Sequence, residues 1–401
     1  MLALNAEIVT MTQQLQKTLR DLLLITLFTL CISFIIWLPH LLHLNFYGLN
    51  FSQGFDTIYR NYDGLEYVVI AKSLYFPELL KDIPQSLPSI YYAAHFPGYS
   101  LAILALAPLL GYLKSMLFVS LLFTILSAWM FYLLVKDFEL TKHPLWLTFL
   151  FLILPARWVI IHSVGSSETM FIFFVIAALY FLMKYEASQK WGFIYLTGLF
   201  GLGAQITRPP GALLALAIGI YLLWKIIRSK ENVFKSIGAT IYRYHPLLFI
   251  PLALIAVFSW YQLAYGDFFA YFKTGDNIHL VFPPYQVFNK EQFWVGEIWL
   301  EDIIYVFILG FLGVMYLFKQ KLYPLAFFVL IYLLATIFVT HRDISRYAAP
   351  IFPFLIIAFE KILTTKEFKI VTLIIALAIY LYTQNFLLNN TGPYPNVGWF
   401  N

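Results

Sequence analysis

The chain has little charge, a single cysteine and no long polar stretch. Only 12% of its 401 residues are Asp, Glu, Lys or Arg. The lone Cys31 excludes a disulfide within the chain. No polar stretch is long enough to bury a core of its own, so we expect no soluble domain. No internal repeat is evident, which argues against a transporter built from inverted repeats.

Apolar residues dominate instead. They make up 61% of the chain, and the mean hydropathy is +0.77. Apolar runs of about 17–25 residues are long enough to cross a bilayer as helices, and helices satisfy their own backbone groups there. We therefore expect an all-α polytopic membrane protein, forming one domain over residues 1–401. Its net charge of +5 then reflects topology and implies no nucleic-acid partner.

About 11–12 hydrophobic segments are expected. They are 22–38, 98–113, 115–135, 145–160, 169–183, 191–206, 211–227, 247–265, 302–318, 322–340, 349–363 and 370–388. Two longer polar connections, about 39–95 and 266–301, separate some of them. Lys17 and Arg20 precede the first segment, which indicates a retained signal-anchor with its start in the cytoplasm.

Lysine and arginine cluster in alternate connections, and this orients the chain. Cytoplasmic loops carry an excess of these residues. The clusters comprise Lys184, Lys190, Lys225, Arg228, Lys230, Lys235, Arg243, Lys319, Lys321, Lys361, Lys366 and Lys369. With these inside, residues 39–95, Glu168, Arg208, 266–301 and 341–348 face outward.

One segment between residue 95 and Glu168 must then fail to cross, because three segments separate two outward positions. Segment 98–113 is short, follows Pro97 and contains Pro108. Segment 145–160 contains Pro155 followed by Arg157. Lys136 and Lys142 place 136–143 in the cytoplasm, so we expect 98–113 to be the partial span.

The candidate site residues collect on the outer face. They are Asp56, Arg60, Asp63, Glu66, His95, Glu168, Arg208, Arg342 and Arg346. Charged groups at membrane depth mark functional sites more often than structural ones. A carboxylate can remove the proton of an attacking hydroxyl, and arginines can hold a phosphate. This chemistry suits group transfer from a lipid-linked phosphate, with Asp63 as the catalytic carboxylate.

Each of these residues also has a structural interpretation. Asp63 before Gly64 is a good turn pair, and Glu66 one helical turn later could face water. Asp56 and Arg60 are spaced as a surface helical pair. Glu168 could cap its helix after two serines, and Arg208 could be an interfacial cation. His95 could be a packed polar group.

Five short segments together resemble the GT-C glycosyltransferases, and most closely the PIG-V-type mannosyltransferases. They read NYDGLEYVVIAK, HFPGYSLAILALAPLL, LPARWVIIHSVGSSETMF, ITRPPGALL and SRYAAPIFP. The matched positions are Asp63, Tyr67, Ile70, Ala71, Phe96, Pro97, Tyr99, Pro155, Ser167, Glu168, Phe171, Thr207, Arg208, Gly211, Arg346, Phe352 and Pro353. Tyr62 stands where the family has tryptophan, and Gly165-Ser166 where it has a Pro-Tyr-like pair.

The resemblance implies a GT-C transmembrane fold with the catalytic Asp63 in the first outer loop, and Glu66 in the same loop is the second candidate catalytic residue. It implies a polyprenyl-phosphate-linked monosaccharide, plausibly mannose, as donor, an inverting transfer and no metal or other cofactor. Arg208, Arg342, Arg346, Glu168, His95 and Asp56 are the candidate donor-phosphate and substrate-binding residues. The acceptor would be a glycan, a glycolipid or a protein. The short loops favour a prokaryotic plasma-membrane enzyme with an outward-facing site.

Two other functions remain open. A lipid-linked oligosaccharide polymerase or ligase would use the same face, but such proteins usually place catalytic arginines in a long late outer loop. Residues 266–301 contain Lys273 and Lys290 and no arginine. A non-enzymatic flippase or transporter of lipid-linked sugars would need polar groups along a path through the membrane, and the expected spans are nearly free of charge.

Overall fold

The structure, a computed structural model, describes residues 2–83, 87–229, 232–274, 280–295, 300–392 and 397–400. Helices account for nearly all of the ordered elements, as the apolar runs predicted. An unexpected addition is a short antiparallel hairpin of β1 (Asn45–Phe46) and β2 (Leu49–Asn50). Its two turn residues, Tyr47 and Gly48, both have positive φ, as a tight two-residue turn requires.

Within the described chain, seven helices are long and apolar enough to cross a membrane, or eight if one bent pair counts as a single span. Most predicted segments coincide with a helix. The matching helices are α1 (Leu2–Leu41), α6 (Tyr112–Asp137), α9 (Ser167–Ser188), α10 (Trp191–Thr207), α11 (Gly211–Arg228), α13 (Phe249–Tyr265), α14 (Glu301–Lys319), α15 (Tyr323–Thr336) and α19 (Lys366–Asn389).

One predicted segment bends at a proline, and another is broken into shorter helices. The predicted span 145–160 is a pair of helices, α7 (Pro144–Ile153) and α8 (Ala156–His162), bent by 76° at Pro155. Proline disfavours the helical conformation of the residue before it, here Leu154, so α7 ends at Ile153. The predicted span 349–363 is likewise divided into η6 (Ala349–Ile351), α17 (Phe352–Ala358) and α18 (Glu360–Leu363).

One helix between the predicted segments 211–227 and 247–265 was not predicted. The lysine-bearing connection after α11 contains α12 (Val233–Tyr244), which continues through η2 (His245–Leu248) into α13. Asn232 accepts a hydrogen bond from the backbone N–H of Phe234 and so caps the helix. Phe234 and Ile241 are exposed beside Lys235, so α12 mixes apolar and charged residues as an amphipathic helix does. It therefore contains no continuous apolar run from which it could be predicted.

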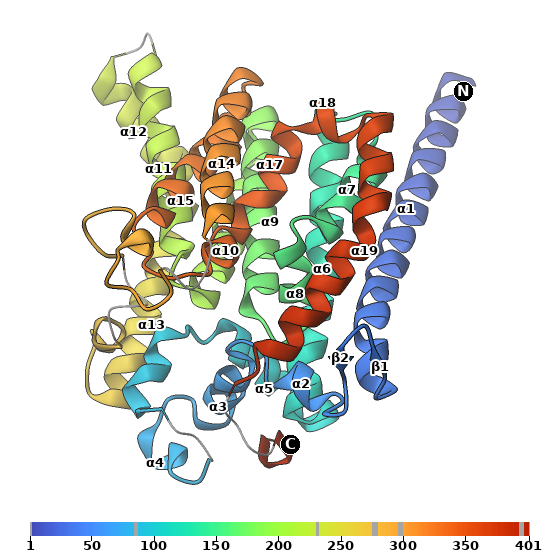
Figure 1. Cartoon of the computed structure of the whole chain (residues 1–401). Coiled ribbons are helices and arrows are strands. Elements are labelled where there is room, and N and C mark those ends of the chain that lie inside the picture. Colours follow the sequence, from blue (N-terminus) through green and yellow to red (C-terminus); the bar gives the residue numbers. More distant parts are fainter. Residues whose placement is uncertain are drawn as a thin grey trace.

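The lysine-bearing connections gather at one end of the helix bundle, here called the lysine-rich end. Lys184 pairs with Asp137 at 2.8 Å, and Lys225 pairs with Glu186. Thr141 Oγ1 donates to Glu360 Oε1 at 2.6 Å. In Figure 1 the N-terminus, α12 and α18 lie at this end. The alternation of charge along the sequence thus corresponds to one physical surface.

The opposite end, here called the site end, carries the first long connection (Figure 1). Its short elements lie around the ends of the long helices. They are α2 (Asp56–Tyr59), α3 (Gly64–Ser73), α4 (Pro77–Leu80), η1 (Ser89–Ala94), α5 (Gly98–Leu110), η3 (Ala270–Lys273), η5 (Gln286–Phe288), α16 (Ile344–Tyr347) and η7 (Val397–Phe400). A second hydrophobic core lies beneath this loop, apart from the core of the bundle.

Helix α5 has the features expected of the partial span. It has 13 residues, about 20 Å in length, which is short of the hydrocarbon thickness. Its first residue, Gly98, packs against Thr207 at the end of α10. Beyond its last residue, the Tyr112 ring lies 4.7 Å from Lys72 Nζ of α3. Both ends of α5 therefore lie at the site end.

Candidate functional site

Asp63 lies in a tight turn that directs its carboxylate away from its own helix. Asn61 anchors the turn by donating side-chain hydrogen bonds to Thr57 O at 2.7 Å and to Leu387 O of α19 at 2.9 Å. Asp63 occupies the N-cap position of α3 but makes no side-chain capping bond. The carboxylate is thus available for other partners, which weakens the interpretation of Asp63 as a turn residue alone.

Arg346 of α16 bridges two carboxylates that are far apart in the sequence. Its Nη2 lies 2.7 Å from Asp63 Oδ2, and its Nε lies 2.6 Å from Glu168 Oε1. The face of its guanidinium lies 4.0 Å from the ring centroid of Tyr62. Charge-assisted bonds of this length are among the strongest hydrogen bonds in proteins, so Arg346 is firmly held.

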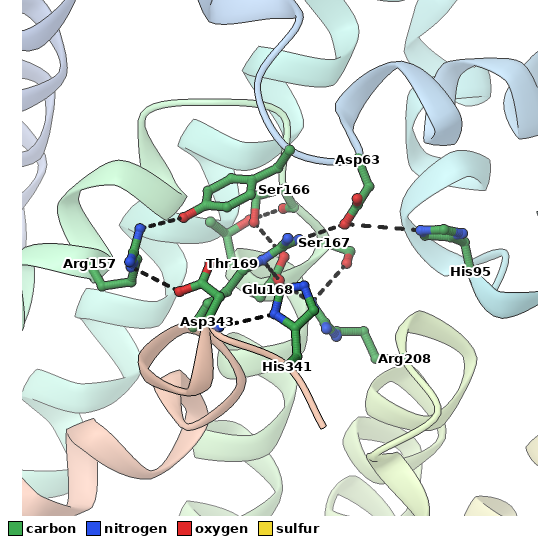
Figure 2. A network of polar contacts seen from close by, with 12 residues as sticks. Asp63, His95, Arg157, Ser166, Ser167, Glu168, Thr169, Arg208, His341 and Asp343 are labelled. Atoms are coloured by element: carbon green, nitrogen blue, oxygen red, sulfur yellow. Dashed lines mark hydrogen bonds and ion pairs between the residues drawn. The ribbon is translucent and has the colours of Figure 1, made fainter. Parts of the chain in front are cut away.

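Glu168 binds a second arginine. Its Oε1 also pairs with Arg208, which follows the last residue of α10, while Ser166 Oγ donates to Oε2 at 2.6 Å. Arg208 Nη1 donates in addition to Ser167 Oγ at 3.3 Å. Asp63, Glu168, Arg208 and Arg346 form what we call the carboxylate–arginine cluster. Figure 2 shows its two carboxylates beside the serines that begin α9.

The two carboxylates differ in access. The Asp63 side chain keeps 34% of its surface, whereas that of Glu168 keeps 2%. Only Asp63 can therefore meet a substrate directly. Glu168, enclosed between two guanidinium groups and a serine, holds the arginines in place. Its ion pairs with two arginines from other elements give it a role beyond capping its own helix.

His95 faces Asp63 from the side opposite the other cluster members (Figure 2). Its Nε2 lies 4.0 Å from Asp63 Oδ2, and its ring packs edge-on against Tyr67. Burial lowers the pKa of His95 below its ordinary value, and the nearby carboxylate offsets this only in part. His95 is therefore a neutral neighbour of Asp63 at neutral pH.

The electrostatics of Asp63 are set by two opposing effects. Partial burial raises its pKa, but the Arg346 guanidinium, with a contribution from His95, outweighs burial and lowers the pKa of Asp63 below its ordinary value. Asp63 is therefore ionised at neutral pH. With two carboxylates and two guanidinium groups, the carboxylate–arginine cluster is formally neutral.

Two of the predicted candidates, Asp56 and Arg342, make contacts outside the cluster. Asp56 begins α2, and its charge acts on Tyr59. Arg342 lies 5.9 Å from the ring centroid of Phe293. Neither contact involves the carboxylate–arginine cluster. Glu66 is in the first turn of α3, and its charge acts on Tyr91, as does that of Asp63.

A second ion pair beside the cluster was not predicted. Arg157 Nε lies 3.1 Å from Asp343 Oδ1, and its guanidinium lies 4.1 Å from the ring centroid of Phe386. Its Nη1 donates to the Tyr62 hydroxyl at 3.5 Å. Tyr62 thus contacts both Arg157 and Arg346. The available sequence signal was an arginine inside an apolar run, two residues after Pro155.

Tyrosines and glycines bring the matched segments together. Tyr67 shares a 2.7 Å hydrogen bond with Ser167 Oγ, and the Tyr99 hydroxyl accepts from Ser166 N at 3.1 Å. A Cβ on Gly64 would lie 3.2 Å from Gly165 O, so these two backbones approach closely. Within the described residues, no group of three or more His, Cys, Asp or Glu is placed to hold a metal ion.

The comparisons with known proteins agree with this architecture. Residues 112–268, less than half of the chain, match the family described as dolichyl-phosphate-mannose-protein mannosyltransferase. No curated protein matches the chain. The PIG-V-type resemblance therefore stays a resemblance, and the likeness to the matched family covers the central part of the chain, from α6 to α13.

Two solved structures of an oligosaccharyltransferase from Archaeoglobus fulgidus resemble the chain. One, the archaeal AglB in complex with an inhibitory peptide and a dolichol-phosphate, has a TM-score of 0.55 at 14% identity. The other, tethered to an acceptor peptide containing the NVT sequon, has a TM-score of 0.53 at 16% identity. Each match covers 94% of this chain and 56% of the other, so the chain spans little more than half the length of these proteins. At such identity the likeness shows the fold, and the predicted GT-C transmembrane fold is confirmed.

Proposed function

We propose that this protein is a membrane glycosyltransferase that uses a polyprenyl-phosphate-linked monosaccharide as donor. The observation that carries the proposal is the carboxylate–arginine cluster, partly open at Asp63, at one end of a GT-C bundle. Mannose is the sugar we propose, because the description of the matched family names dolichyl-phosphate mannose. The acceptor is a hydroxyl of a glycan, a glycolipid or a protein.

Asp63 is the proposed general base. The acceptor oxygen attacks the anomeric carbon of the donor sugar, and the bond from that carbon to the phosphate oxygen breaks. The hydroxyl proton passes to the Asp63 carboxylate, and the polyprenyl phosphate leaves with the electron pair. Attack from the face opposite the phosphate inverts the anomeric configuration. General base catalysis of this kind typically contributes about 10²–10⁴-fold to the rate.

The arginines are proposed to hold the donor phosphate. Arg346 and Arg208 keep 12% and 16% of their side-chain surfaces, so each is reachable while its carboxylate partner fixes its orientation. A guanidinium suits a phosphate because it offers several donors in one plane. Both lie at a helix end, where the phosphate of a lipid donor would lie while its chain stays in the bilayer.

The test of the proposal is Asp63→Asn in a reconstituted transfer assay with a polyprenyl-phosphate mannose donor. We expect a loss of transfer of at least about 10²-fold, since the amide cannot accept the proton. Glu78→Gln, an exposed carboxylate of α4 in the same loop, is the matched control and should transfer at the wild-type rate. Near-normal transfer by a folded Asp63→Asn protein would exclude Asp63 as the base.

We also propose that the reaction needs no metal ion. Two guanidinium groups already supply positive charge where the leaving phosphate would lie. Transfer should therefore continue at an unchanged rate in excess EDTA. A loss that added Mg²⁺ or Mn²⁺ restores would contradict this proposal.

Transfer of a whole oligosaccharide is the second candidate, because the similar solved structures are of an oligosaccharyltransferase. The two functions differ in the donor that is consumed. Supplying polyprenyl-phosphate monosaccharide and polyprenyl-diphosphate oligosaccharide in parallel separates them. Turnover of the second donor alone would replace the first proposal.

The proposed location is the plasma membrane of a prokaryote, with the site end facing outward. The separation of the lysine-rich end from the site end supports this orientation, since basic connections remain in the cytoplasm. A donor whose sugar is presented on the outer leaflet fits that arrangement.

A further inference from the structure

We propose that Asp63 and the donor phosphate compete for Arg346, so that donor binding releases the base. This inference rests on the proposed function and concerns how the same site is regulated. Arg346, the ion-pair partner of Asp63, is also a cation that the donor phosphate would bind.

In the structure, Arg346 has its Nη2 committed to Asp63 at 2.7 Å and its Nε to Glu168 at 2.6 Å. The two contacts are unequal in access. Glu168 is enclosed and also binds Arg208, so it cannot leave without stranding two buried cations. Asp63 retains a third of its surface and is the partner that an incoming anion can replace.

Charge balance favours replacement over simple addition. The cluster is formally neutral, so adding a phosphate to it would leave an excess negative charge at a partly buried site, which is costly. If the phosphate oxygen takes the place of the Asp63 carboxylate on Arg346, each guanidinium keeps an anionic partner. Asp63 then carries the excess charge, which it loses on accepting a proton.

The released carboxylate has a place to go. His95 lies on its other side, 4.0 Å from Oδ2, and presents a neutral imidazole. A carboxylate that moves from a guanidinium toward a neutral ring binds a proton more readily. The resting ion pair thus keeps Asp63 a weak base until the phosphate is bound, and the donor itself makes the base competent.

The experiment measures binding of farnesyl phosphate, a polyprenyl monophosphate without sugar, to the purified full chain in detergent. If Asp63 competes for Arg346, Asp63→Asn and Asp63→Ser should both bind the probe about 5-fold or more tightly than the wild type, as a coupling of 1 kcal/mol or more predicts. Asn and Ser differ in size, so an effect that both variants share reflects the lost carboxylate charge and not the packing of one side chain.

Asp343→Asn is the matched control. It removes a nearby carboxylate that pairs with Arg157 instead of Arg346, so its affinity should change clearly less than that of the Asp63 variants. Unchanged or weaker binding by both Asp63 variants would overturn the competition while leaving the proposed transferase function in place. Absence of binding by the wild type and by every variant would overturn the lipid-phosphate donor and the competition with it.

Discussion

At the scale of single residues, His95 shows how burial tunes the candidate base. Its imidazole is enclosed by Tyr67 and Tyr91 and lies at the edge of a cluster with two guanidinium groups. A protonated ring would pair with Asp63, but burial outweighs that gain and lowers the pKa of His95. A neutral His95 leaves the carboxylate free to accept a proton, whereas a charged one would hold it as an ion pair.

This lowered pKa predicts a loss of stability on acidification. Between the folded-state pKa of His95 and about 6.5, its unfolded value, the unfolded state binds more protons. Stability therefore falls as the pH falls through that window, by at most about 1.4 kcal/mol per pH unit from this group. The depressed pKa of Asp63 acts in the same direction, but only below about pH 4.

The measurement is thermal unfolding in detergent from pH 8 to pH 5.5. The wild type should lose more stability than His95→Gln over this range, and the difference between the two should close as the pH falls. His143→Gln, an exposed histidine at the lysine-rich end, should follow the wild type. Parallel curves for the wild type and His95→Gln would show that His95 does not titrate differently on folding.

Part of the site could be predicted from the sequence, because charged residues are scarce in it. In an apolar chain, Asp63, Glu168, Arg208 and Arg346 stand out, and alternating lysines placed them on one face. Arg157 was used only to judge a segment boundary, and its pairing with Asp343 depends on how α8 bends toward α16. The bridging by Arg346 of two carboxylates, 283 and 178 positions away, follows from packing that no local pattern encodes.

At the scale of elements, hydrophobic runs predicted the long helices well because burial in lipid leaves the backbone no alternative. The hydrophobic runs failed to predict the elements that do not span the lipid. Helix α12 is amphipathic, the hairpin of β1 and β2 is only a few residues long, and the region 349–363 is broken into three pieces. Each of these elements depends on interfacial or tertiary contacts.

Helix α5 shows why a short element matters to the site. Its first residue, Gly98, lies so close to α10 that a Cβ there would be 2.9 Å from Ile206 O and from Thr207 Cα. The neighbouring atoms belong to the backbone and cannot rotate away. The next residue along α10 is Arg208, so the close approach of the two helices fixes the position of a cluster member.

We expect Gly98→Ala to cost about 1–3 kcal/mol by overpacking and to lower transfer about tenfold or more by displacing Arg208. Unfolding temperature and transfer rate measure the two effects. Gly192→Ala is the matched control, because a Cβ at Gly192 would meet nothing within 4 Å. Wild-type stability and activity in Gly98→Ala would mean that α5 can shift without disturbing the site.

At the scale of the whole molecule, the two ends of the bundle have different chemistry. The lysine-rich end joins its basic connections by ion pairs such as Lys184–Asp137, while the site end holds the buried cluster. Lys114, at the start of α6, is a cation at the site end. Lys114 and Lys142 lie near opposite ends of α6, so they lie on opposite sides of the membrane if α6 crosses it. Labelling the two positions therefore reports the orientation of the chain.

Orientation can therefore be measured with two substitutions in a Cys31→Ser background. Lys114→Cys should react with a membrane-impermeant maleimide in intact cells, because both ends of α5 and the start of α6 lie at the outward site end. Lys142→Cys, exposed at the other end, should react only after permeabilisation. The reverse pattern would turn the site toward the cytoplasm, where the donor would have to present its sugar on the inner leaflet. Labelling of both positions from outside would mean that α6 does not cross, and segment 98–113 could then no longer be the partial span.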